Sequence, residues 1–233
     1  MPMSLCLFLS VTLNNGVAGI DPVQLERQLS EVKGVIRQAI HMPVSLTGVD
    51  PFLSADQAPQ CVIQLYFADL DALESAMHDD GPLASVIDTA ASAGWRWTQQ
   101  AMLVRRFAVP GASPVDSRRL ERTTYLVAYE GKTEEDEAWL AHYIRQHPAL
   151  MVKLPGIREV EVYTRIDYCS DLRAKRVRTL QRNKVVFDSI AALSDALASP
   201  LREELRKDFL SLPPFTGASP HYPMQTFEQY SPE

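Results

Sequence analysis

The sequence has little cysteine, and its three cysteines are far apart. Cys6, Cys61 and Cys169 form no CxxC pair, which argues against a disulfide framework or a zinc site and fits thiols in a reducing cytoplasm. No apolar run reaches the roughly 18 residues of a membrane span. The apolar start, MPMSLCLFLSVTL, lacks a basic region and a clear cleavage site, so we expect no signal peptide. These absences predict a cytoplasmic protein that does not associate with a membrane.

The motifs of several common ligand sites are also missing. P-loop, GxGxxG and GxSxG patterns do not occur. The net charge of −6 and the lack of an RNP-type aromatic motif argue against nucleic-acid binding. His142 and His147 are separated by five positions, about 140° around a helix, so they cannot hold one ion from one face. We therefore expect neither a metal ion nor a cofactor.

An internal repeat is present. The 233 residues, 46% of them apolar, suffice for one large globular domain or two of about 110 residues. Residues 64–77, QLYFADLDALESAM, match residues 184–197, KVVFDSIAALSDAL, at a constant offset. Each unit predicts a strand, an N-cap (Asp69 or Ser189) and an amphipathic helix. The matched apolar pairs are Phe67 with Phe187, Leu70 with Ile190, Leu73 with Leu193, Ala76 with Ala196 and Met77 with Leu197.

The remainder of each half fits around this unit. In the second half we expect a strand at TTYLVAY, a helix from Glu134 to His147, a strand at IREVEVY, the repeat unit and a last strand near MQTFEQY. In the first half we expect a strand at LCLFLSVTL, a helix from about Pro22 to Ile40, a weak strand near Val44 to Val49, the repeat unit and a strand at AMLVRRF. Both halves then have the β-α-β-β-α-β order of a ferredoxin-like fold.

The predicted domains are residues 1–108 and 124–233, joined by a linker at 109–123 that is rich in Pro, Gly, Ser and charge. A lone ferredoxin-like sheet leaves one face bare, and two such sheets can bury their bare faces against each other. We therefore predict an α+β fold in which two tandem ferredoxin-like repeats form a pseudo-dimeric α/β barrel with a small-molecule site. The chain could also pair as a homodimer.

The second half resembles the EthD family of dimeric α/β-barrel proteins, named for ethyl tert-butyl ether degradation. The matching residues are Trp139, Tyr143, His147-Pro148, Leu150 and Leu154-Pro155-Gly156-Ile157, followed by Phe187-Asp188-Ser189, Ala192-Leu193, Ser199-Pro200 and Asp208-Phe209. They span most of residues 124–228, and the resemblance implies the barrel fold and a small-molecule pocket. The first half departs from this pattern, because His41 stands two residues before Pro43 and no Pro-Gly follows. We expect it to be a degenerate copy, with the well-formed pocket on the second half.

Three residues at helical spacing form the first candidate site. Trp139, Tyr143 and His147 lie on one stripe of the expected helix. Pro148 predicts that the helix ends near His147, at the negative end of the helix dipole, which favours the charged imidazole, whereas burial favours the neutral one. His147 is therefore the candidate acid/base residue, with Tyr143 beside it and Trp139 as a pocket wall. A structural histidine that caps helix carbonyls is the alternative.

The strand REVEVYTR predicts a second set. Glu161, Tyr163 and Arg165 share one face and the valines share the other, which suits the helix-covered side. The three polar residues then point into the barrel, where they either orient a polar ligand or pair across the two sheets. The segment LRAKRVRTLQRNK adds six basic residues between Arg173 and Lys184, which either attract an anion or form a solvated loop.

These observations leave three functions open. The first is an enzyme, an oxidoreductase or lyase, that transforms a small apolar or aromatic metabolite without a cofactor through His147. The second is a non-catalytic carrier or accessory protein on the same fold. The third is a haem protein, because some related barrels bind haem through a histidine. The residues do not choose among oxygenation, decarboxylation, dehydration and isomerisation.

Overall fold

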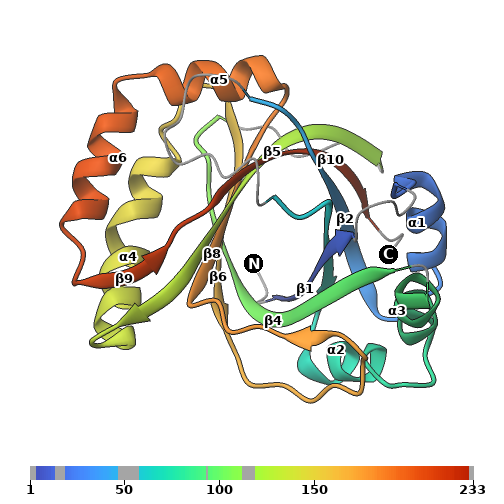
Figure 1. Cartoon of the computed structure of the whole chain (residues 1–233). Helices are drawn as coiled ribbons and strands as arrows, with labels where there is room; N and C mark the ends of the chain where they lie inside the picture. Colours follow the sequence, from blue (N-terminus) through green and yellow to red (C-terminus); the bar gives the residue numbers. More distant parts are fainter. Residues whose placement is uncertain (1–3, 14–18, 47–57, 93, 112–118, 231–233) are drawn as a thin grey trace.

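Eight antiparallel strands close into one ring, which Figure 1 shows nearly end-on. The structure is a computed structural model and describes residues 4–13, 19–46, 58–92, 94–111 and 119–230. The strands follow one another around the ring as β1-β3-β2-β10-β5-β8-β6-β4, and β4 pairs with β1 to close it. The ring strands are β1 (Ser4–Leu13), β2 (Val35–Pro43), β3 (Cys61–Phe67), β4 (Trp95–Phe107), β5 (Arg119–Thr133), β6 (Ile157–Arg165), β8 (Gln181–Phe187) and β10 (His221–Tyr230).

Each half of the chain supplies four neighbouring strands and the helices that cover their outer face. The order β4-β1-β3-β2 in the first half and β10-β5-β8-β6 in the second is that of a ferredoxin-like sheet, which confirms the predicted fold class. Short strands β7 (Lys175–Arg176) and β9 (Phe215–Ala218) pair outside the ring with β4 and β5. The helices are α1 (Pro22–Leu29), α2 (Leu70–Ala76), α3 (Pro82–Ser92), α4 (Asp136–Met151), α5 (Ile190–Ala198) and α6 (Leu201–Leu210).

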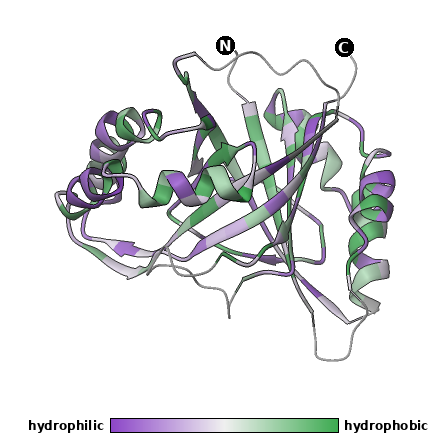
Figure 2. Cartoon of the chain, turned by 90° about the horizontal axis from the view of Figure 1, so that it is seen from above, coloured by the Kyte–Doolittle hydropathy of each residue, from purple (hydrophilic) through white to green (hydrophobic). Residues whose placement is uncertain are grey.

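The two helical layers lie on opposite sides of the strands, as Figure 2 shows. One apolar core fills the space under α1, α2 and α3, and a second fills the space under α4, α5 and α6. A third, smaller apolar cluster, which includes Cys6, Phe8 and Met102, lies inside the ring. No helix among the described residues is long and apolar enough to cross a membrane.

The internal repeat has the same local structure in both halves. Asp69 and Ser189 are the N-caps of α2 and α5, and their side chains accept hydrogen bonds from the backbone N–H groups of Ala72 (2.8 Å) and Ala192 (3.2 Å). Leu73 and Leu193 are fully buried, each in the core of its own half, and so are the matched strand residues Phe67 and Phe187.

The first-half helix is shorter than predicted. The expected helix from Pro22 to Ile40 ends at Leu29, and β2 begins at Val35, whereas residues 44–46 form no strand. Gly34, with φ 78°, turns the chain between them, and Gly156, with φ 70°, does the same before β6. Residues 47–49 of the expected weak strand fall outside the described residues. His41 is consequently a strand residue and not the end of a helix.

The prediction that α4 ends at His147 is also wrong. The helix runs through Pro148 to Met151, and the backbone N–H of Val152 donates to the carbonyl of Pro148 at 3.0 Å. Pro148 lacks only its own N–H and so the turn after it still closes. His147 therefore lies within α4, and its side chain projects from the side of the helix. The strand β5 begins at Arg119, within the segment predicted as a linker, and the domain boundaries stay a prediction.

Gly34 and Gly156, which both have positive φ, offer a matched test of the repeat. We expect alanine at either position to destabilise the protein by about 1–2 kcal/mol, because L-residues resist the left-handed conformation. The loss should be larger for Gly34→Ala, whose Cβ would lie 3.3 Å from the Cβ of Ala72, than for Gly156→Ala, whose nearest contact is 3.8 Å from Ala192. Urea unfolding of both variants measures this order. Equal losses, or a larger one for Gly156→Ala, would contradict it.

Candidate functional site

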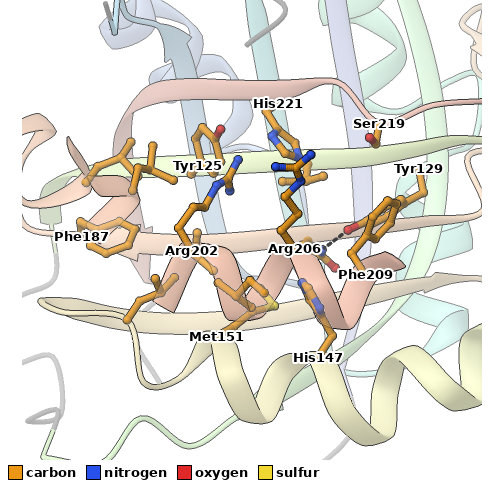
Figure 3. A pocket seen from close by; sticks show the side chains of 17 residues that line it. Tyr125, Tyr129, His147, Met151, Phe187, Arg202, Arg206, Phe209, Ser219 and His221 are labelled. Carbon is orange, nitrogen blue, oxygen red and sulfur yellow. Dashed lines mark hydrogen bonds between the residues drawn. The ribbon is translucent and has the colours of Figure 1, made fainter. Parts of the chain in front are cut away.

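A cavity of about 100 Å³ lies between the outer face of the second-half sheet and the helices α4, α5 and α6 (Figure 3). Its walls are mainly apolar, with Met151 from α4, Val185 and Phe187 from β8 and Phe209 from α6 among them. The apolar stripe of each helix faces the sheet, so the cavity lies within the second apolar core, under α4, α5 and α6. This volume is below the roughly 150 Å³ of a cavity that holds benzene, so it suits a ligand of at most about one ring.

His147 lines this cavity and is held by a carboxylate. Its Nδ1 lies 2.7 Å from Oδ2 of Asp208, and both side chains are about nine-tenths buried. A carboxylate only accepts, so Nδ1 carries the proton that it donates to Asp208, and Nε2 keeps a free lone pair in the neutral ring. The tilted ring of Tyr143 packs on the imidazole with centroids 4.6 Å apart. The pair of helices α4 and α6 thus fixes one tautomer of the histidine.

The electrostatics of the site favour a neutral imidazole. Burial lowers the pKa of His147, and the hydrogen bond and charge of Asp208 oppose this without cancelling it. The ring is therefore unprotonated near neutral pH, the form in which a histidine acts as a general base.

A second polar group at the cavity, the hydroxyl of Tyr125, has no hydrogen-bond partner among the described residues. Tyr125 lines the cavity from β5, and its buried hydroxyl makes no hydrogen bond to the described part of the chain. A buried hydroxyl without a partner is destabilising unless a ligand or water satisfies it. Figure 3 shows Arg202 and Arg206 extending from α6 toward Tyr125 and His221. The mainly apolar lining of the cavity thus includes two cationic side chains.

Tyr143 and Trp139 lie behind the cavity wall. Both are fully buried, and their rings stack with centroids 5.2 Å apart. The hydroxyl of Tyr143 bonds to Nδ2 of Asn183 at 2.5 Å and to the hydroxyl of Tyr129 at 3.2 Å, and burial raises its pKa well above the ordinary value. Tyr143 thus stays protonated, and its ring packs against the imidazole of His147. Its catalytic role and the ligand contact of Trp139 remain predictions.

Glu161 and Tyr163 lie on the other face of the sheet, inside the ring. As predicted, the valines of β6 face the helices, and these two polar residues point inward, where both are fully buried. The carboxylate of Glu161 pairs with Arg37 (3.0 Å), Arg106 (2.7 Å) and Lys184 (2.9 Å). It also accepts a short hydrogen bond from Tyr163. This arrangement matches the second interpretation of the strand, in which its polar residues pair across the two sheets. Contact of these residues with a ligand stays a prediction.

Arg165 is at the surface. It forms an ion pair with Asp136 at the start of α4, and both side chains are about two-fifths exposed. It does not line the cavity of His147. Its predicted contact with a ligand stays untested.

Sequence reasoning overlooked Asp208 and Tyr125 as site residues. Asp208-Phe209 belonged to the family resemblance, but nothing in the local sequence shows that it reaches a histidine 61 positions earlier. Tyr125 stands on the helix-facing side of an alternating strand, where an aromatic residue is ordinary core. A buried hydroxyl without a partner is visible only in three dimensions.

The cavity does not fit haem. Nε2 of His147 could serve as an axial ligand, yet the volume of about 100 Å³ is far below the roughly 300–1,000 Å³ of drug-sized ligand sites, and a porphyrin needs at least that much. Within the described ranges, no three His, Cys, Asp or Glu side chains come close enough to hold a metal ion.

The closed ring with helices outside is the fold of dimeric α/β-barrel proteins, here with both repeats in one chain. A structure described as an anthrone oxidase-like protein matches with a TM-score of 0.60 and 12% identity, over 100% of this chain and 95% of that one. A monooxygenase structure from Lactobacillus acidophilus matches with 0.56 and 10% identity, over 96% and 93%. A chlorite dismutase from Candidatus Nitrospira defluvii matches with 0.51 and 10% identity, over 95% and 90%.

The comparison with the EthD family is weaker. An EthD structure from Bacillus halodurans matches 43% of this chain and 95% of its own length, with a TM-score of 0.35 and 18% identity. No protein-family model matches the sequence, and no curated protein does. The full-length structural matches establish the fold. Their identities of 10–12% are too low to assign an activity to this chain.

Proposed function

We propose that the chain is an EthD-like protein that binds a small, largely apolar or aromatic metabolite in the cavity between α4, α6 and the second-half sheet, and that His147 removes a proton from it. The observation that carries this proposal is the buried His147–Asp208 pair, which leaves Nε2 unprotonated at the wall of an apolar cavity. Tyr125 supplies a hydroxyl that can bond to a polar atom of the ligand. Residues of the EthD resemblance, among them Leu154 and Phe209, line the same cavity.

Oxygenation is the reaction that we favour. A proton from an acidic C–H or O–H of the ligand passes to Nε2, and the remaining electron-rich anion reacts with O₂. One oxygen atom then replaces two hydrogens of the substrate as a carbonyl, and the other leaves as water with those hydrogens, so the substrate supplies all four electrons that reduce O₂. The anthrone oxidase-like and monooxygenase structures on this fold support this class. Such chemistry needs no cofactor, because a carbanion or phenolate is itself the reductant.

Mass spectrometry of the small molecules that copurify with the protein tests this. We expect an aromatic compound with the wild type and its loss from Leu197→Phe, because Leu197 lines the cavity and is nearly fully buried. The matched control is Met77→Phe, the repeat-related position in the first half, which should keep the compound. Overpacking either core by this change costs roughly 1–3 kcal/mol, so both variants are compared at equal folded fraction.

The fate of the bound compound in air separates the alternatives. Conversion to a product richer in oxygen supports the enzyme. A compound that stays unchanged supports the non-catalytic carrier, and a Soret band in the purified protein supports the haem protein. Retention of the compound by Leu197→Phe would place its binding site elsewhere.

A further inference from the structure

A second and larger cavity, of about 460 Å³, opens at one mouth of the ring. Its walls are inward-facing side chains, with Phe8 from β1, Leu126 from β5, Arg182 from β8 and Tyr222 from β10 among them. The ion-paired residues around Glu161 lie toward the other mouth, because Arg37, Glu159 and Glu228 stand at the opposite ends of their strands. The volume falls within the roughly 300–1,000 Å³ typical of small-molecule sites.

Arg182 is the unusual residue of this cavity. Its Nε is buried and has no hydrogen-bond partner within the described ranges. Its Nη2 donates to Oγ1 of Thr179 at 3.0 Å, and the guanidinium lies over the ring of Phe8 at 5.1 Å. Among the described residues no carboxylate forms an ion pair with it, whereas Arg37 and Lys184, two buried cations inside the ring, each pair with three.

Arg182 is partly buried, and no carboxylate among the described residues pairs with it. Burial lowers the pKa of Arg182, and the charge of Glu130 at the rim only partly offsets this. A cation held partly away from water without a counter-ion is destabilising. Residues that break such a rule without local compensation concentrate at functional sites. An anion seated on the guanidinium would supply the missing partner.

The charge of the lining points to one negative charge. Arg178 and Arg182 line the cavity together with the single carboxylate of Glu130, which leaves one positive charge in excess. Burial also raises the pKa of Tyr222 to about 12, so its hydroxyl stays protonated. Phe8, Val62 and Leu126 provide an apolar wall beside these polar groups.

We propose that this mouth of the ring is a second ligand site, which binds a small monoanionic carboxylate with an apolar body through the guanidinium of Arg182. The carboxylate accepts hydrogen bonds from Arg182, including the unpartnered Nε–H, and the body of the ligand packs on Phe8 and Leu126. The six basic residues of the segment from Arg173 to Lys184 thus do not share one location or one role. Lys184 is an internal ion-pair partner, and Arg182 and Arg178 belong to this site.

Titration with benzoate, and with benzamide as its uncharged counterpart, tests the proposal. The side-chain Nε–H resonance of Arg182 in a proton–nitrogen correlation spectrum reports contact directly. We expect benzoate to shift this resonance and to raise the melting temperature, and benzamide to do neither. The variant Arg182→Met should weaken benzoate binding at least about tenfold, because hydrogen bonds to charged groups contribute that much. Without ligand, Arg182→Met should melt at or above the wild-type temperature.

Two controls separate this site from its surroundings and from the site of His147. Arg173→Met changes an exposed arginine of the same segment, whose partner is Asp88 at the surface, and should leave benzoate binding unchanged. His147→Asn should also leave it unchanged, so that a failure of the proposed acid/base role does not affect this result. Equal binding of benzoate by Arg182→Met and the wild type, equal binding of benzamide, or no binding of benzoate would each overturn the proposal. Tighter binding of phenyl phosphate than of benzoate would overturn the assignment to a monoanion.

Discussion

Replacing Glu161 by glutamine is expected to destabilise the protein by about 3–5 kcal/mol, the usual loss when one member of a buried ion-pair network is removed. Glu161 is fully buried and contacts the cations Arg37, Arg106 and Lys184. With Glu159 and Glu228 the network holds three carboxylates against these three cations. The glutamine keeps the size of the side chain and leaves one buried positive charge uncompensated.

The network also predicts the response to acid. Burial alone would raise the pKa of Glu161, but Lys184, Arg37 and Arg106 hold it well below the ordinary value. A carboxylate whose pKa is lower in the folded chain stabilises the fold above roughly pH 4.3, and that stability is lost as pH falls. Burial, aided by Lys184, lowers the pKa of His41 to about 3, so the folded state also loses stability as pH falls from roughly 6.5 toward 3. Glu161→Gln should therefore be less sensitive to acid than the wild type.

Urea unfolding between pH 7 and about pH 3 measures both effects. The matched control is Asp188→Asn, which removes a carboxylate from a surface pair with Arg158 whose side chains are about half exposed. Exposed pairs contribute little, so this variant should unfold close to the wild type. The double variant Glu161→Leu with Lys184→Met removes one charge of each sign and should recover part of the loss. A loss for Glu161→Gln no larger than that of Asp188→Asn would contradict the prediction.

The fold was predictable from the sequence because the repeat carries its own evidence. The caps Asp69 and Ser189 and the apolar spacing around Leu73 and Leu193 specify the same strand, turn and helix twice. The error in the first half has a local cause. Leu25, Leu29 and Val32 continue at helical spacing toward Ile36, and this pattern concealed Gly34, which ends the helix region as Gly156 does in the second half.

That error also hid the true counterpart of the histidine. Counted back from the two glycines, the position that corresponds to His147 is Leu25, a buried residue of α1. His41 instead lies inside the ring, where its ring nitrogens are 2.8 Å from Oγ1 of Thr226 and 2.8 Å from Oε1 of Gln64. Leucine has no group that accepts or donates a proton. Of these two corresponding positions, only His147 in the second half can therefore act as an acid or base.

The partners of the site residues were beyond sequence reasoning. Periodicity placed Glu161 and Tyr163 on the inward face of their strand, but Arg37, which pairs with Glu161, comes from a strand that the pattern assigned to a helix. Likewise, Asp208 meets His147 only because α4 and α6 pack side by side on one sheet. Spacing along one element predicts which residues share a face. It does not predict which faces of distant elements meet.

His147→Asn is expected to reduce turnover of the identified substrate by roughly 10²–10⁴-fold, the usual contribution of a general base. Asparagine can still donate a hydrogen bond to Asp208 but cannot accept a proton, so the stability of the variant should stay near that of the wild type. His147→Leu should lose activity and also stability, because it leaves the carboxylate of Asp208 buried without its partner. If asparagine retained turnover and only leucine were harmful, the histidine would be structural.

Asp208→Asn should change the pH dependence of kcat/KM, which a purely structural role of Asp208 would leave unchanged. Asp208 orients the imidazole and raises its pKa against the effect of burial. Its neutral replacement should lower kcat/KM by about 10–100-fold, as is typical for a group that orients a histidine from behind. Activity needs the neutral ring and so falls as pH drops through the pKa of His147. Because that pKa is lower in the variant, the acid limb of its kcat/KM profile should move to lower pH. A limb that stays in place would show that a different group carries the proton.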